Sequence, residues 1–563
     1  MIKIKFYSVL LAFFLFLISW LIPNHYYPWS TFYNDWVAGA GVLFLILGFV
    51  FVEDKRGQRI DRVVAICLFF SLIPIVQWLG GIVFFMGDAL LAFLYIFGFC
   101  LAVFVGSNSE KNADFADVFA STLGVGALIS VFLALCQWLG LDGLGMWLID
   151  MPPGGRPYAN LAQPNNLASL FGLGLVSVCY LRERGFLGRA VFWLVTILLF
   201  AGVAMTRSRM SIIVILVLAG WLFLGIRRLQ LRCSRVEVLA GIGIFLGLWL
   251  AWPTISESLY LSADSSLARL EGAVAGELRW VIWRQLLDAV LREPWFGYGW
   301  NQVSVAQMVV AAEYPASVFT EHAHNLLIDI LCWNGLLFGG GVLLWLGWWV
   351  FSRMRSVNSL SAWFGMALVL VLGTHSMFEF PLDYAFFLVP FGFAVGFVEG
   401  DHGGRSLQLP RWVAGVVGML GLVFAIWIFV EYQLIQTDYN RLRYESAGLE
   451  IRSANPAPPD VKLLTQSREF IRFARTEARQ GMSAEELEWM RQVAFRYAYP
   501  PAMFRYALAL GLNGRYEEAE TQLLRLRQLH PPIRYQEAQE GWAAMAERFP
   551  ELGNVRVPGM AVR

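Results

Sequence analysis

The pattern of apolar positions divides the chain into a long membrane part and a polar tail. As far as residue 430, apolar stretches follow one another with only short polar segments between most of them. About 20 apolar residues in a helix cross the hydrocarbon core of a bilayer. We therefore predict about 12–13 transmembrane helices. Their approximate bounds are 6–22, 37–52, 63–80, 82–105, 117–141, 167–181, 190–205, 210–226, 237–253, 326–351, 361–378, 385–400 and 412–430.

The tail, residues 431–563, is rich in Arg and Glu, and prolines divide it into short amphipathic helices. The segments Met503–Asn513 and Arg515–His530 are joined by Asn513-Gly514 and carry Ala and Leu at helical spacing. They resemble one tetratricopeptide unit, which must pack on neighbouring helices because a lone unit cannot bury its apolar face. We predict an all-α protein with a membrane domain (1–430) and a TPR-like helical domain (431–563). The tail either binds a protein or is a structural cap.

Composition supports the membrane prediction. Hydrophobic residues make up 58% of the chain and charged residues 15%, with a mean hydropathy of +0.56. Soluble domains carry about 25% charged residues, so this chain must use lipid as a solvent. A net charge of +1 argues against a nucleic-acid partner. The six cysteines show no paired spacing, so neither a disulfide framework nor a metal knot is indicated.

The distribution of basic residues predicts the orientation, because cytoplasmic loops are enriched in Lys and Arg. With the N-terminus in the cytoplasm, the basic residues on the inside are Lys3, Lys5, Lys55, Arg56, Arg59, Arg62, Lys111, Arg182, Arg184, Arg189, Arg227, Arg228, Arg232, Arg235, Arg353, Arg355, Arg405 and Arg411. Those in outer loops are Arg156, Arg207, Arg209, Arg269, Arg279, Arg284 and Arg292. This bias places a long loop (254–325) and the tail outside, in the periplasm of a cell with two membranes.

Arginines in outer loops are therefore informative. Arg207 and Arg209 lie between two apolar spans, and Arg279 lies in an amphipathic stretch, four residues before Trp283. Each could be an interfacial residue that snorkels to lipid headgroups. As a group they could instead clamp a diphosphate bidentately, and a lipid-linked diphosphate would bring that charge to the membrane face.

The long loop ends in Glu321-His-Ala-His-Asn325, just before an apolar span. A histidine is suited to act as a base at neutral pH, since its ordinary pKa is about 6.5. His322 and His324 could also bind a metal ion, but no further ligand stands at a matching spacing nearby. We predict no metal site.

The stretch that begins at His324 carries a recognisable spacing. His324-Asn325 is followed by nine residues and then by Gly335. This spacing resembles the signature of the O-antigen ligase and polymerase superfamily, from which Phe338 departs, because the family often has Gly, Thr or Tyr there. Three other stretches resemble the same superfamily: Thr206-x-Ser-Arg209, Arg279-x-x-x-Trp283 and Glu293–Gly299.

Two further stretches, Gly155–Ala168 and His375–Tyr384, resemble the bacterial protein O-oligosaccharyltransferases, the branch that glycosylates pilins. Their amide and phenol side chains are typical hydrogen-bonding groups for sugars or peptides. Capping, turn formation or an interfacial aromatic belt are the alternatives. The candidates for substrate or acceptor binding are Asn160, Gln163, Asn165, Asn325 and Tyr384.

The resemblance implies a GT-C-like membrane glycosyltransferase that uses no cofactor and no metal. Its donor would be an oligosaccharide on a polyprenyl (undecaprenyl) diphosphate, and its acceptor a Ser or Thr of an exported protein such as a pilin. The reaction would take place at the periplasmic face of the inner membrane. Arg209 and Arg279, with Arg207, would hold the diphosphate, and His324 would be the base. The alternatives are O-antigen ligation or polymerisation, transport of lipid-linked sugars, and a scaffold that acts through its tail.

Overall fold

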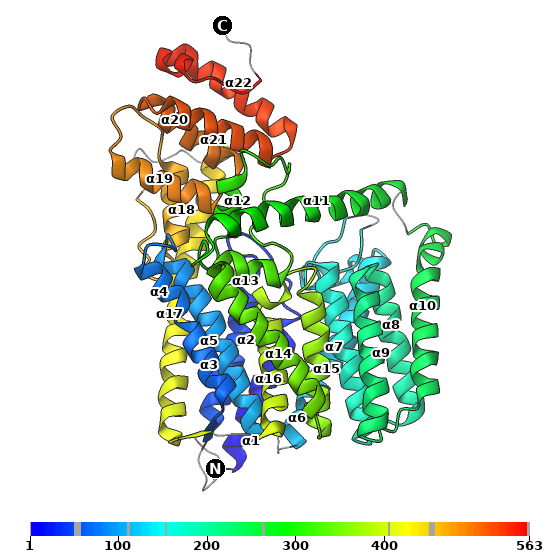
Figure 1. The fold of residues 1–563 in the computed structure, drawn as a ribbon. Coiled ribbons are helices and arrows are strands. Elements are labelled where there is room, and N and C mark those ends of the chain that lie inside the picture. Colours follow the sequence, from blue (N-terminus) through cyan, green and yellow to red (C-terminus); the bar gives the residue numbers. More distant parts are fainter. Residues whose placement is uncertain are drawn as a thin grey trace. The chain divides into compact units, whose positions relative to one another are not determined.

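The computed structural model describes residues 2–49, 58–109, 113–152, 155–261, 265–403, 406–449 and 457–559. Nearly every element in these ranges is a helix (Figure 1). The strands β1 (Gln58–Ile60) and β2 (Leu407–Leu409) form one antiparallel pair, in which Gln58 lies opposite Leu409. The predicted all-α class is confirmed. Of the basic residues used to predict the orientation, Lys55, Arg56, Lys111 and Arg405 lie outside the described residues.

The chain folds into two compact units, each assembled from segments that are far apart in the sequence. The first comprises Met1–Ser71, Leu94–Leu270 and Gly347–Trp427. The second comprises Leu72–Phe93, Glu271–Leu346 and Ile428–Arg563. Four helices contribute residues to both units: α5 (Met86–Ser109), α11 (Ser265–Arg292), α14 (Gly340–Ser356) and α17 (Arg411–Ser446).

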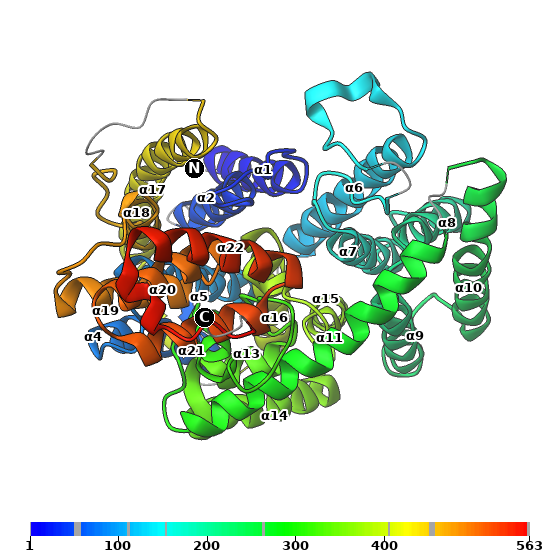
Figure 2. The same cartoon turned by 90° about the horizontal axis from the view of Figure 1, so that it is seen from above.

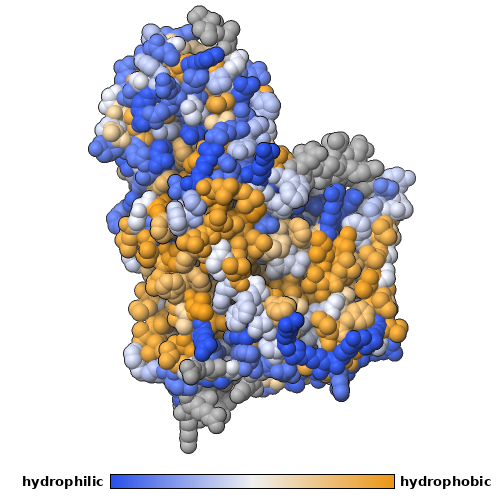
Figure 3. Space-filling view, in the orientation of Figure 1, coloured by the Kyte–Doolittle hydropathy of each residue, from blue (hydrophilic) through white to orange (hydrophobic). Residues whose placement is uncertain are grey.

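The first unit holds most of the apolar helices. Its other helices are α1 (Ile2–Ser19), α2 (Phe32–Phe49), α3 (Arg62–Ser71), α6 (Ala113–Trp138), η1 (Asp142–Trp147), α7 (Pro164–Glu183), α8 (Arg189–Thr206), α9 (Met210–Arg228), α10 (Arg235–Ser258), α15 (Leu360–His375), η3 (Pro381–Asp383) and α16 (Ala385–His402). Helix α10 lies beside α8 and α9 (Figures 1 and 2). Its exposed side chains include Val236, Leu239 and Leu250. Apolar side chains cover this part of the surface (Figure 3), as expected of helices that face lipid.

The described part of the chain contains nine helical segments that are long and apolar enough to cross a membrane. They are Arg62–Leu79, Met86–Ser109, Ala113–Trp138, Pro164–Glu183, Arg189–Thr206, Met210–Arg228, Arg235–Ser258, Leu326–Ser356 and Arg411–Ser446. Shorter apolar helices occupy Ser8–Ser19, Phe32–Gly48 and Leu360–His375, and α16 occupies the remaining predicted span. Each predicted span thus coincides with a helical segment, and the chain is a multi-pass membrane protein.

The second unit combines polar and apolar helices around one core. Its other elements are α4 (Ile73–Leu79), α12 (Val303–Val310), α13 (Leu326–Asn334), the π-helical turn η2 (Gly335–Gly339), α18 (Thr465–Arg475), α19 (Ala484–Arg496), α20 (Pro500–Leu512), α21 (Tyr516–Leu529), α22 (Pro532–Arg548) and η4 (Pro550–Asn554). The predicted hairpin in the tail is present as α20 and α21 (Figure 2). Gly514 lies in the turn between them, with φ +76°.

The tail helices share their buried core with α11 and α12, which lie far earlier in the sequence. One cluster of buried side chains contains Leu286 of α11 and Val305 of α12, together with Met490 of α19, Leu526 of α21 and Trp542 of α22. Burial of apolar surface is the main favourable term in folding. The helices beyond residue 457 are therefore packed into the second unit instead of forming a core of their own.

Candidate active site

The segment that carries the two histidines of the motif, residues 312–325, is called here the His loop. It lies in the second unit, where two fully buried amides hold it. Gln307 of α12 donates to the Oε1 of Gln285 on α11 (3.0 Å) and to the carbonyl of Val318 (3.1 Å). Its own Oε1 accepts from the backbone N–H of Thr320 (3.0 Å). Since buried polar groups are costly unless they are paired, this network fixes the course of the loop.

The alanine between the two histidines is anchored on both sides. The indole N–H of Trp283 on α11 donates to the carbonyl of Ala323 (2.8 Å). The backbone N–H of Ala323 donates to Oδ1 of Asp329 on α13 (2.7 Å). Ala323 and Asp329 are both buried. These two bonds fix both backbone polar groups of Ala323, the residue next to His324.

His324 itself has a left-handed backbone, with φ +53°. This conformation is uncommon for residues other than glycine, although His adopts it more often than most, and such strain concentrates at functional sites. The next residue, Asn325, caps α13, because its side-chain oxygen accepts from the N–H groups of Leu327 (3.0 Å) and Ile328 (3.4 Å). The His-Asn pair thus combines a strained histidine with the residue that starts the following helix.

His322 lies on the other side of Ala323 and is half-buried. Burial lowers the pKa of its imidazole, although the carboxylates of Asp329 and Glu321 oppose the shift. The ring is therefore mostly neutral at pH 7. Within the described ranges no group of three or more His, Cys, Asp or Glu side chains is arranged to hold a metal ion.

The glycine of the motif has a packing role. Gly335 has φ +75° and lies directly against the backbone of the segment 294–296, where a Cβ would be only 2.7 Å from the carbonyl oxygen of Pro294. The N–H of Tyr298 donates to the carbonyl of Cys332 (2.7 Å). The two stretches that the sequence singled out, Glu293–Gly299 and the motif, therefore cross backbone to backbone, which only a residue without a side chain allows.

Arg279 belongs to the same part of α11 as Trp283. Residues four apart lie on one face of a helix, about 5–6 Å from each other. The face of α11 that carries Arg279 is therefore the face that meets the His loop through Trp283. Both residues and His324 belong to the second unit.

The other predicted arginines lie in the first unit, at the turn between α8 and α9. Arg207 ends α8 with φ +50°, and Arg209 precedes the first residue of α9. Both side chains are exposed. Between them Ser208 is buried.

A polar cluster occupies the same end of this helix group. Asn165 of α7 donates to Glu379 (3.1 Å), and the hydroxyl of Ser169 lies 2.7 Å from Nδ1 of His375 at the end of α15. Asn166 lies within hydrogen-bonding reach of Tyr384. Its Oδ1 is buried and has no hydrogen-bond partner among the described residues.

The depth of this cluster is set by the packing of α7. A side chain at Gly172 would touch Val371 of α15 and Val214 of α9. Along α15, Val371 lies four residues before His375. Val214 of α9 lies five residues after Arg209, and Gly172 of α7 lies seven residues after Asn165. At a rise of about 1.5 Å per residue, all three polar residues lie about two turns or less beyond this contact. The structure thus brings Arg209, Asn165 and His375 to one end of the helix group.

Asn160 and Gln163, both predicted to bind substrate, lie in the segment before α7. Asn160 is buried, and its amide donates to the carbonyls of Leu21 (2.8 Å) and Trp147 (2.9 Å), while its oxygen accepts from the N–H of Ile149 (3.2 Å). These contacts favour the alternative of a residue that shapes the turn. Gln163 is the residue before α7 and is half-exposed, and its side chain does not cap the helix.

Comparisons with known proteins match each of these regions. The chain matches the family model described as O-Antigen ligase over residues 194–340, and the model "Virulence factor membrane-bound polymerase, C-terminal" over residues 363–544. A third model, Protein glycosylation ligase, matches residues 157–181. A curated protein of Acinetobacter baylyi (strain ATCC 33305 / BD413 / ADP1), "General O-oligosaccharyltransferase", is 29% identical over 543 residues, 93% of both chains. A second from the same organism, "ComP-specific O-oligosaccharyltransferase", is 28% identical over 413 residues, 72% of this chain and 73% of the relative.

Over most of its length the chain is similar to the protein O-oligosaccharyltransferases, and it carries matches to the O-antigen ligase and protein glycosylation ligase models. It is therefore a glycosyltransferase. The O-antigen ligase match includes the α8–α9 turn, α11 and the His loop, and the protein glycosylation ligase match covers nearly all of α7. The resemblance read from the motifs is confirmed.

The oligosaccharyltransferase also contains supporting residues that the sequence did not reveal. Trp283 was visible only as part of a motif, and Gln285, Gln307, Asp329 and Ser169 were not assigned a role. The one available signal was that Asp329 is a charged residue at the start of an apolar span, which usually has a specific partner.

Proposed function

We propose that this oligosaccharyltransferase moves an oligosaccharide en bloc from a polyprenyl diphosphate to a Ser or Thr hydroxyl of an exported protein. The names of both relatives and the match to protein glycosylation ligases support this assignment. The observation that carries it is the anchoring of Ala323 by Trp283 and Asp329, which holds His324 in a strained conformation against α11.

In this proposal His324 is the general base. It accepts the proton of the acceptor hydroxyl as the hydroxyl oxygen attacks the anomeric carbon of the donor. The bond between that carbon and the diphosphate oxygen breaks, so direct displacement inverts the anomeric carbon. A positioned base contributes about 10²–10⁴-fold to such a reaction.

The leaving group is a diphosphate, which two guanidinium groups suit well. Arg209 and Arg279, with Arg207 nearby, would bind its oxygens bidentately and stabilise the charge that develops on them. Asn165, Gln163, Asn325 and Tyr384 remain candidates for contacts with the sugar or acceptor, and Asn160 would act through the turn that it shapes. We expect the reaction to need no metal ion and no cofactor.

The proposed setting follows from the distribution of basic residues. We infer that the N-terminus is cytoplasmic and that the His loop and the helices beyond residue 457 lie in the periplasm, at the inner membrane. The donor would be undecaprenyl-linked and the acceptor pilin-like.

A second candidate acceptor is a glycan. The matches described as O-Antigen ligase and as a membrane-bound polymerase support transfer to lipid A core or to another repeat unit. The chemistry at His324 and the diphosphate would be the same.

One experiment tests the proposal and separates the two acceptors. The purified chain is incubated with a lipid-linked oligosaccharide and either a candidate pilin or lipid A core, and the products are read by intact mass. The expected result is a pilin that gains the whole glycan with the wild type and not with His324→Ala, while His322→Ala retains more activity. Transfer to lipid A core alone would establish the glycan acceptor instead.

A further inference from the structure

Arg496, at the end of α19, is a largely buried charged residue of the second unit that reaches the His loop. Its guanidinium donates to both carboxylate oxygens of Asp88 at the start of α5, each at 3.1 Å. The third nitrogen, Nη1, lies 3.8 Å from Oε1 of Glu321 in the His loop. The Arg496 side chain is 13% exposed and that of Asp88 is 2% exposed, so solvent screens the bridge to Asp88 little. Burial opposes the charge, but the carboxylates of Asp88 and Glu321 raise the pKa of Arg496 above its ordinary value.

Further contacts tie Tyr499, the residue before α20, and helix α21 to the His loop. The hydroxyl of Tyr499 donates to Oε1 of Glu321 (3.3 Å), and its ring packs edge-on against Phe319, with 5.6 Å between centroids. The N–H groups of Ala316 and Ser317 both donate to the carbonyl of Gln528 on α21 (2.9 and 2.8 Å). The loop that carries His324 is thus bound to two helices of the tail.

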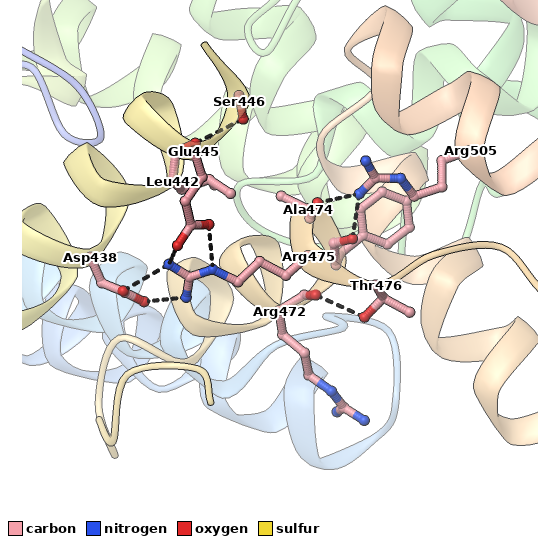
Figure 4. A network of polar contacts seen from close by, with 10 residues as sticks. Asp438, Leu442, Glu445, Ser446, Arg472, Ala474, Arg475, Thr476 and Arg505 are labelled. Carbon is pink, nitrogen blue, oxygen red and sulfur yellow. Dashed lines mark hydrogen bonds and ion pairs between the residues drawn. The ribbon is translucent and has the colours of Figure 1, made fainter. Parts of the chain in front are cut away.

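The tail helices are in turn fixed to α17. Figure 4 shows Arg475 of α18 between Asp438 and Glu445 of α17. Its guanidinium donates to both carboxylates, at 2.8 to 3.3 Å, and its side chain is 4% exposed. Glu431, also on α17, accepts from the N–H groups of the segment 462–464. Helix α18 and the segment before it, which belong to the same tail as Arg496, are therefore anchored on the apolar helix α17.

We propose, on the basis of the proposed function, that Arg496 is a positioning residue for glycan transfer, acting through Glu321 to hold the His loop in the geometry that presents His324. Glu321 lies three residues before His324, on the N-terminal side of Ala323, to whose backbone Trp283 and Asp329 are bonded. Because Arg496 contacts the carboxylate of Asp88 on α5 and that of Glu321 in the loop, it holds these two carboxylates at a fixed separation. A displacement of about 1 Å at a reacting group lowers a rate by about 10²-fold.

The test measures steady-state transfer by the full chain in lipid nanodiscs. The variants are Arg496→Gln, Arg496→Lys and Glu321→Gln, with Arg515→Ala as the matched control. Arg515 forms an exposed ion pair with Glu518 in the same tail and contacts no residue of the His loop through this pair. The thermal midpoint of each variant is recorded by intrinsic fluorescence.

Arg496→Gln is expected to lower kcat by about 10- to 100-fold, while KM for the lipid-linked donor changes by less than about threefold. Arg496→Lys should recover part of kcat, because an ammonium group can reach one carboxylate but cannot reproduce the two-sided fork. Should Arg496→Gln fail to fold, Glu321→Gln decides the question. It removes only the loop end of the bridge from a half-exposed position and should still lower kcat several-fold.

Unchanged kcat in both Glu321→Gln and Arg496→Lys, or a loss confined to donor KM, would overturn the proposal. The proposal is also overturned if the loss of kcat in each variant parallels its fall in thermal midpoint and Arg496→Lys restores neither kcat nor the midpoint. A wild type that transfers no glycan to protein would instead refute the proposed function, so the two failures are distinguishable.

Discussion

Trp283→Phe isolates a single hydrogen bond in the candidate site. The substitution keeps an aromatic ring but removes the indole N–H that donates to the carbonyl of Ala323 at 2.8 Å. Ala323 has no exposed surface, so water cannot easily replace the lost donor. An unsatisfied buried carbonyl costs about 1–3 kcal/mol. Because the cost falls on the His loop, we expect it to shift the balance between the anchored loop and a displaced one.

The size of the effect follows from that cost. A shift of 1–3 kcal/mol corresponds to a population change of about 5- to 150-fold, taking RT as about 0.6 kcal/mol. If only the anchored loop is active, kcat falls by at most this factor, and donor binding is largely retained. The assay is single-turnover transfer at saturating donor, read by intact mass.

Trp280→Phe serves as the control, because Trp280 lies three residues before Trp283 on α11 and its ring packs edge-on against Trp283 (5.2 Å between centroids), but it is 72% exposed. We expect its rate to stay within about twofold of the wild type, as exposed substitutions are usually within about 0.5 kcal/mol. A Trp283→Phe variant that is as active as Trp280→Phe would refute the argument that anchoring of Ala323 matters for catalysis.

Four other predictions concern different parts of the molecule. Arg209→Lys and Arg279→Lys should each weaken donor use at least tenfold, since a point charge cannot replace a bidentate fork, and donor titrations check this. Asn166→Leu should raise KM for the donor with little change in thermal midpoint, if its buried oxygen accepts from a sugar; an unaltered KM would contradict that role. Burial lowers the pKa of His530, so its contribution to stability is present above about pH 6.5 and is lost as the pH falls further; His530→Gln should flatten the midpoint's acid dependence. Ser467→Cys should react with an impermeant maleimide once the outer membrane is permeabilised, and reaction only after inner-membrane rupture would reverse the proposed orientation.

The membrane helices could be predicted from the sequence because each needs only length and apolarity. The thirteen predicted spans all coincide with helical segments. The assembly of the second unit could not, because its core joins residues such as Leu286 and Trp542 that no local pattern links. Of the 28-residue helix α11, only an amphipathic stretch around Arg279 was predicted, since that helix has a mixed surface and no uninterrupted apolar stretch.

The motif itself was partly predictable. The spacing from His324 to Gly335 identified the superfamily, and the structure supplies the reason for the glycine in the crossing with Pro294. The departure at Phe338 has little effect on that crossing, because this side chain lies in the π-helical turn after Gly335 and is 39% exposed. Asn325 was predicted to bind substrate, whereas its side-chain oxygen accepts from the first turn of α13.

The balance of energies around His324 explains why its anchors are numerous. A left-handed backbone costs a residue other than glycine about 1–2 kcal/mol. Against this, the bond from Trp283 contributes about 0.5–1.5 kcal/mol, and the bond from Ala323 to the charged Asp329 about 1.5–3 kcal/mol. These two bonds therefore exceed the cost of the left-handed backbone by at most a few kcal/mol, and the loss of either bond removes much of this local margin. Whole-molecule stability is set elsewhere, in the buried core of the unit, so such variants should remain folded while transfer fails. A base whose position depends on the bonds of the neighbouring Ala323 is expected to show this separation of folding from activity.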